Sequence, residues 1–255
     1  MKTGTAETPA QDLLRPASVA TRSGFFLYMS LGFLAVALIG FSTTLFLPLA
    51  RGTFVAPPIV YAHGVLLFAW LVFLIAQAAL IRVRTVALHR RLGWLGAFLG
   101  IAIVISGVAL SLHVTRRDLA AGRGDVVLGE FVGGLITFLI FGSLIAAAIV
   151  LRRNSESHKR LLLLATIWVL APAWLRFRHF FPAVENPMVV FSIIADSLIV
   201  VAIARDLLAY KRVHPVYIWV GGLLIAFDTI VLSSAGFQNA AWIRVARWLL
   251  GDAAT

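Results

Sequence analysis

The chain has 255 residues, of which 61% are hydrophobic and only 13% are charged, and its mean hydropathy is +0.96. Soluble domains are usually about 45–50% apolar and about 25% charged, so this composition excludes a soluble domain and indicates an integral membrane protein. The sequence contains no cysteine, which excludes disulfides, thiolate metal sites and iron–sulfur clusters.

The formal net charge is +11, but the basic residues lie in short turns between apolar runs. This distribution is typical of the positive-inside rule and of contact with anionic lipids at the inner turns. We therefore expect the lipid bilayer as the main partner and no nucleic-acid binding.

Residues 1–22 are polar and lack an apolar segment, so we expect a flexible cytoplasmic tail and no signal peptide. Seven apolar runs follow, and we interpret each as a helix that crosses the bilayer. Their approximate bounds are 24–47, 59–81, 92–114, 129–151, 161–175, 187–204 and 216–236. The sequence thus predicts an all-α, polytopic membrane helix bundle, with a transmembrane domain over 23–237 and an outer amphipathic helix and tail over 238–255.

Orientation follows from the distribution of basic residues between the two sides. With the N-terminus inside, the 22 Lys and Arg residues divide into 14 on the inner side and 8 on the outer side. This bias favours a cytoplasmic N-terminus and an outer C-terminus. We expect a multi-pass protein of the bacterial inner membrane.

The second run carries a polar stripe. His63, Trp70 and Gln77 recur at intervals of seven residues, so they lie on one helix face over about 21 Å. This pattern predicts that the face contacts protein, or a ligand, more than lipid.

Three later segments carry packing signals. Gly96 and Gly100 have the spacing that lets two helices approach closely, either within the bundle or between copies. Pro172 should kink the fifth helix because proline removes a backbone hydrogen bond. Residues 240–250 place apolar and basic side chains on different faces, which predicts an interfacial helix.

Two acids lie inside apolar runs, where a charge is costly and indicates a function or a partner. Asp196 and Asp228 both fall roughly 12–14 Å below the outer boundary of the bilayer core. The same arithmetic places four further polar residues above them, within about 6 Å of that boundary: His63, Glu130, Arg176 and His179.

Three explanations fit this outer cluster. It is a structural network, in which Arg176 neutralises an aspartate and Trp70 and Gln77 add hydrogen bonds. Alternatively, it is a redox or metal site with imidazole and carboxylate ligands. The third explanation is a path for a substrate or a proton through the bundle.

The six histidines divide evenly between the two sides. Those on the inner side, at positions 89, 158 and 214, adjoin basic turns, and we interpret them as solvated residues of the interface. The outer histidines are the candidate cofactor ligands: His63, His113 and His179.

The pattern AHG…W…Q…LHRRLG, followed by SHKRLLLLAT and RVHP, resembles an uncharacterised family of bacterial multi-pass membrane proteins. This likeness extends over most of the chain and implies no activity. Over two helices, AHGVLLFAW and HRRLGWLG also look like the histidine helices of transmembrane ascorbate-reducible cytochromes b.

The second resemblance implies a cofactor, haem b, held by pairs of histidines near each membrane face. His63 matches one such position, with His113 or His179 as its outer partner. His89 matches an inner position, with His158 or His214 as its partner. The remaining histidines lie at helix ends instead of inside the runs, which departs from the cytochrome pattern.

Two functional hypotheses follow. The first is a membrane redox protein that binds haem or another His-ligated metal, with His63 as the leading ligand. The second is a non-enzymatic protein, such as a permease for a small-molecule ligand or an assembly factor for another membrane protein. The sequence has no HExxH, GxSxG or P-loop motif to indicate a catalytic class.

Reporter fusions test the predicted orientation. A reporter inserted in residues 118–125 should signal an outer location, and one inserted in residues 154–157 should signal the cytoplasm. A cytoplasmic signal from residues 118–125 would overturn the topology.

Overall fold

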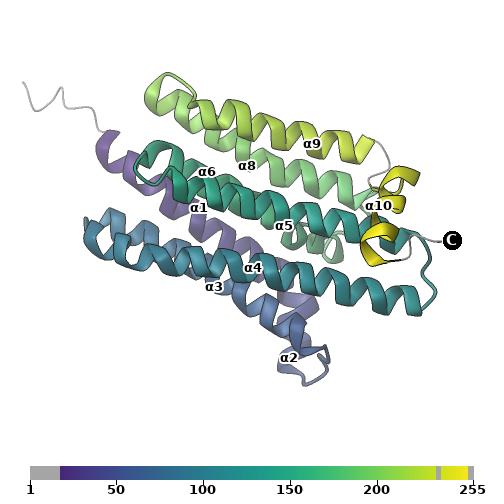
Figure 1. The fold of residues 1–255 in the computed structure, drawn as a ribbon. Helices are drawn as coiled ribbons and strands as arrows, with labels where there is room; N and C mark the ends of the chain where they lie inside the picture. Colours follow the sequence, from purple (N-terminus) through teal and green to yellow (C-terminus); the bar gives the residue numbers. More distant parts are fainter. Residues whose placement is uncertain (1–17, 234–236, 252–255) are drawn as a thin grey trace, which may run out of the picture.

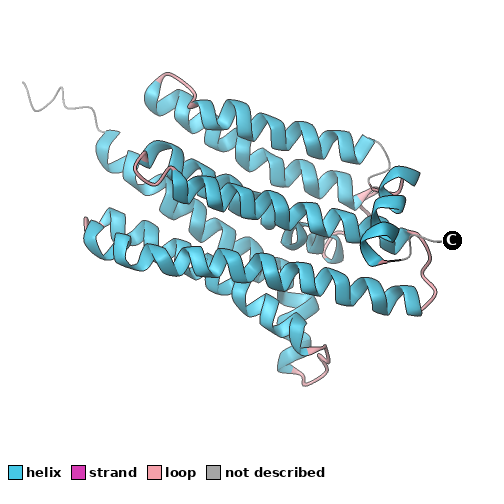
Figure 2. Cartoon of the chain, viewed as in Figure 1, coloured by secondary structure: helices cyan, strands magenta, loops and turns pink. Residues whose placement is uncertain are grey.

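The computed structural model describes residues 18–233 and 237–251, and the regular structure of this part is helical throughout (Figures 1 and 2). In chain order its elements are α1 (Ser18–Phe41), η2 (Ser42–Phe46), α2 (Leu47–Ala50), α3 (Pro58–Arg82), α4 (Val86–Ala120), α5 (Val126–Val150), α6 (Ser155–Val169), α7 (Ala171–Leu175), η3 (Arg176–His179), α8 (Pro187–Tyr210), η4 (Tyr217–Gly221), α9 (Gly222–Ser233) and α10 (Ala240–Leu250).

Within the described residues, six helices are long and apolar enough to cross a membrane, which confirms an all-helical, multi-pass architecture. They are Gly24–Ala50, Pro58–Arg82, Val86–Ala120, Val126–Val150, Ser155–His179 and Pro187–Tyr210. Over the described residues, the seventh predicted run corresponds to a shorter apolar helix, Tyr217–Val231, and residues 234–236, which follow α9, are not described. This shorter helix lies beside α8 in the bundle (Figure 1).

Several helix ends differ from the predicted bounds. α4 has 35 residues and extends beyond the predicted run at both ends, because its polar ends lower the hydropathy while still favouring a helix. At the N-terminus, residues 18–22 belong to α1 instead of the predicted tail, and residues 1–17 lie outside the described residues. The predicted outer helix is α10, and residues 252–255 are not described.

The predicted kink at Pro172 is present. α6 ends at Val169, and α7 begins at Ala171 with Pro172 in its first turn. Proline has no N–H to donate and clashes with the preceding turn, so the fifth span divides at this point.

The small-residue face of α4 is used inside the bundle. A Cβ atom on Gly96 would lie 2.5 Å from the ring of Phe73 on α3, and one on Gly107 would overlap the ring of Phe138 on α5. α4 therefore packs closely against both neighbours, as a small-xxx-small face permits.

One end of the bundle carries the turns after α3, α5 and α8, with Arg84, Arg152 and Lys211; we call it the basic end. A buried ion pair joins two helices there. Arg160 of α6 donates from Nε and Nη2 to the carboxylate of Asp206 on α8, at 2.9 and 2.8 Å. Both side chains are 1% exposed.

Further groups surround this pair. Glu156 accepts from Arg160 Nη1, and Arg205 Nη1 donates to Asp206 at 3.0 Å. The ring of Tyr217 lies 5.4 Å from the Arg160 guanidinium. Because a buried charge is stable only when it is paired and hydrogen-bonded, this network fixes α6, α8 and η4 relative to one another.

The other end, which we call the distal end, carries α10 and the α4–α5 turn. Arg123 bridges Asp118 and Glu130 there, and Arg247 of α10 pairs with Asp125 at 3.0 Å. The apolar side of α10 packs on α5 around the buried Ala246. α10 therefore lies across the distal end of α5, as Figure 1 shows.

The buried ion pair generates a prediction about stability. Arg160→Met leaves the buried Asp206 with only Arg205 to compensate it, and breaking such a pair costs about 3–5 kcal/mol. We expect the melting temperature in detergent to fall by roughly 10 °C.

Lys159→Met is the matched control on the same helix. Lys159 pairs with Glu156, whose side chain is 48% exposed, so its loss should cost less than about 1 kcal/mol. Equal losses of melting temperature in the two variants would contradict the importance of the Arg160–Asp206 pair.

Candidate functional site

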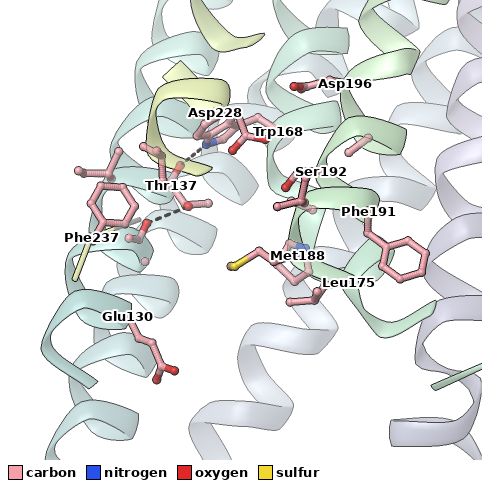
Figure 3. A pocket seen from close by; sticks show the side chains of 18 of the residues that line it. Glu130, Thr137, Trp168, Leu175, Met188, Phe191, Ser192, Asp196, Asp228 and Phe237 are labelled. Carbon is pink, nitrogen blue, oxygen red and sulfur yellow. Dashed lines mark hydrogen bonds between the residues drawn. The ribbon is translucent and has the colours of Figure 1, made fainter. Parts of the chain in front are cut away.

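A cavity of about 790 Å3 lies between two groups of helices, α5 to α7 on one side and α8 and α9 on the other (Figure 3). It extends from the distal end, where Glu130 and Met188 line it, toward Ile199 and Leu224 in the middle of the bundle. The break at Pro172 lies in its wall.

Two carboxylates from neighbouring helices line this cavity. Asp196 belongs to α8 and Asp228 to α9, and the two are close enough to interact electrostatically. Ser192, one helical turn before Asp196, hydrogen-bonds to Asp228. Within the described part of the chain, neither aspartate forms a salt bridge. Two facing carboxylates in apolar surroundings repel each other and favour a bound cation or proton.

Aromatic rings form much of the wall near the aspartates. Trp168 packs 6.0 Å from Phe227 between ring centroids, and Phe227 lies 6.4 Å from Phe237. Trp168 Nε1 donates to the Thr137 carbonyl at 3.2 Å, which fixes the indole in place (Figure 3). Aromatic faces attract cations, so these rings add to the effect of the carboxylates.

The mouth of the cavity carries basic groups that do not pair with the aspartates. Arg176 Nη1 donates to the Pro172 carbonyl at 2.9 Å, and its guanidinium lies 4.0 Å from the centroid of the Phe41 ring. Arg176 therefore does not neutralise an aspartate in this structure. Glu130 is paired with Arg123 at the mouth, at 3.2 Å.

The structure brings together five residues of the predicted outer cluster. The cavity is lined by Glu130, Arg176, His179, Asp196 and Asp228. The sixth residue of that cluster, His63, is not among the residues that line this cavity.

His63 is enclosed between α3, α4 and α5. The Ser106 hydroxyl donates to the Ile103 carbonyl, so it accepts a hydrogen bond from His63 Nδ1 at 2.9 Å. The ring of Phe138 packs edge-on against the imidazole, with centroids 5.3 Å apart. The side chain is buried, and its contacts are those of a packed core histidine.

The three candidate ligand histidines occupy separate places. His113 is exposed on α4, two turns and about 10 Å beyond Ser106. His179 lines the mouth of the distal cavity, which His63 does not reach. Among the described residues, no group of three or more His, Cys, Asp or Glu could hold a metal. The residues present therefore do not fit a bis-histidine haem at this end.

The other two residues of the α3 stripe are also buried. Trp70 Nε1 donates to Thr166 Oγ1 on α6 at 3.2 Å, and its ring packs edge-on against Phe141. Gln77 is 8% exposed, and its amide group has no hydrogen-bond partner. Trp70 thus joins α3 to α6, whereas Gln77 contributes no hydrogen bond to a network.

Sequence reasoning missed Ser192 and the aromatic residues of the wall. A signal was present, since Ser192, Asp196 and Ile199 recur at helical spacing on α8. Leu224, Asp228 and Val231 do the same on α9. Each aspartate therefore lies on a stripe that faces the cavity.

The fold and the cavity define the class: a multi-pass helical membrane protein with an acidic, aromatic-lined cavity at one end. No family model, curated protein or solved structure matches the chain.

The surroundings of His63 generate a prediction. His63→Ala removes a buried ring and its hydrogen bond to Ser106, so we expect a loss of about 2–4 kcal/mol in stability. We expect the visible spectrum of the purified protein to show no Soret band. A Soret band that disappears in His63→Ala would support the haem hypothesis instead.

Proposed function

We propose that the protein is a seven-helix protein of the bacterial inner membrane, with a cytoplasmic N-terminus, and that its distal cavity binds a small organic cation as a permease does. The observation that carries this proposal is the pair of aspartates, Asp196 and Asp228, in an aromatic-lined cavity. Arg176 and Arg178 also line this cavity, but neither forms a salt bridge with these aspartates among the described residues. An ammonium or aromatic cation supplies the charge that these carboxylates lack.

The size of the cavity supports a small molecule. About 790 Å3 falls within the roughly 300–1,000 Å3 of sites that enclose drug-sized ligands. The walls are largely apolar, and Asp196 and Asp228 place their carboxylates among them. This combination is typical of a binding site that orients its ligand by one or two charged contacts.

The position of the cavity supports passage through the bundle. The wall opposite α8 and α9 is interrupted at Pro172, between α6 and α7. Broken or short helices lining a central cavity are a feature of many transporters. At the basic end, away from the mouth of the cavity, the Arg160–Asp206 pair connects α6 with α8. Alternating access would require this pair to rearrange.

Binding of ethidium tests the cation site. Ethidium is an aromatic cation whose fluorescence increases when it leaves water. We expect saturable binding to the purified protein, weakened about tenfold or more in Asp196→Asn and in Asp228→Asn because each substitution removes a charge contact. The melting temperatures of both variants should be unchanged or higher, since each relieves repulsion between carboxylates.

Glu130→Gln is the matched control, because Glu130 is an exposed carboxylate at the mouth that already pairs with Arg123. Its effect on affinity should stay below about threefold. Uptake of ethidium into proteoliposomes then distinguishes a permease from a protein that only binds. Unchanged affinity in both asparagine variants would sink the proposal and leave a structural or assembly role.

A further inference from the structure

A second cavity, of about 270 Å3, lies at the basic end among α1, α3, α4 and α6. It is separate from the distal cavity and shares no lining residue with it. Its polar side chains include Ser30, Gln77, His89, His158 and Thr166.

Gln77 is the residue that points to a ligand. The side chain is buried, and neither Nε2 nor Oε1 has a hydrogen-bond partner among the described residues. A buried amide without partners costs stability, and such groups are rare in folded proteins. In this cavity Gln77 offers one donor group and one acceptor group to a bound molecule.

Two imidazoles face the same cavity. His158 Nδ1 lies 2.8 Å from the Ala148 carbonyl, so Nδ1 carries the proton and Nε2 has a free lone pair in the neutral ring. His89 Nδ1 is buried without a partner, while the ring interacts with the main chain of Gln77. The two histidines are close enough to affect each other electrostatically. The cavity is therefore rich in acceptors.

The rest of the lining is apolar apart from Ser155 and Lys159. Phe26 and Phe33 of α1 and Leu74 of α3 contribute apolar surface. Lys159 donates to Glu156 at 2.6 Å, so its charge is already compensated. A charged ligand would have no counter-charge here, whereas an uncharged molecule with an aromatic body would pack against the two phenylalanines.

We propose that this cavity binds the headgroup of an uncharged, bilayer-soluble hydroxyaromatic molecule of the quinol class. Two hydroxyl groups would donate to the imidazole lone pairs, and a hydroxyl or alkoxy oxygen on the ring would accept from the Gln77 amide. The volume lies just below the range for drug-sized ligands, which suits a single substituted ring. The hydrogen-bond acceptors of the cavity outnumber its unpartnered donors. A quinol donates from its hydroxyl groups and a quinone cannot, so the quinol binds more tightly than the quinone.

Titration with decylubiquinol and decylubiquinone, under argon and in detergent, tests this site. We expect saturable binding of both by calorimetry, with the quinol tighter. Gln77→Leu should weaken binding about tenfold while leaving the melting temperature unchanged or higher, because it removes an amide that has no partner in the protein. His89→Phe should weaken the quinol more than the quinone.

His113→Phe is the matched control, since His113 is an exposed histidine on α4, the helix that also carries His89. This substitution should leave the affinities for decylubiquinol and decylubiquinone unchanged. Three outcomes would overturn the proposal: no saturable binding to the wild type, unchanged binding in Gln77→Leu, or a Gln77→Leu variant that is unfolded or melts well below the wild type. The last result would show that the amide has a structural partner. Ethidium binding at the distal cavity is independent of all three.

Discussion

The rest of the structure depends on the ion pair between Arg160 and Asp206. Both side chains are almost fully buried, and charges in such surroundings are tolerated only when each is paired and hydrogen-bonded. The pair fixes α8 to α6 at the basic end, and Tyr217 extends the contact to η4. Toward the distal end, the chain opposite α8 and α9 is interrupted at Pro172, between α6 and α7. A cavity lies between these elements there. The ion pair thus holds α6 and α8 together at the basic end, whereas a cavity lies between the two groups of helices toward the distal end.

The two cavities differ in the chemistry they offer. The distal cavity has several aromatic faces and three carboxylates, of which Asp196 and Asp228 form no salt bridge among the described residues, and this combination suits a cation. The basic-end cavity has an amide and two imidazoles, which suit an uncharged molecule with hydroxyl groups. Among the described residues, the two aspartates of the first have no salt bridge, and the Gln77 amide of the second has no hydrogen-bond partner. Most other carboxylates of the described residues, including Asp118 and Glu156, are compensated by neighbouring arginine or lysine.

Much of the fold could be predicted from local sequence, because a membrane-spanning helix must satisfy its own backbone and be apolar along its length. Six long helices and the break at Pro172 follow from that rule and from proline chemistry. The residues at which the helices begin and end were less predictable. α4 continues beyond its apolar run, since polar residues outside the bilayer also form helix, and hydropathy does not detect them.

The sequence by itself determined the helices, the faces of their polar stripes and the depth of the acids. It placed Asp196 and Asp228 at one level, and helical spacing placed His63, Trp70 and Gln77 on one face. Only the tertiary structure decided which faces meet. His63 packs against Ser106 and not beside the aspartates, and Arg160 pairs with Asp206, 46 residues away. The physical reason is that helical periodicity defines a direction around each axis, whereas the identity of the neighbouring helix is set by packing of the whole bundle.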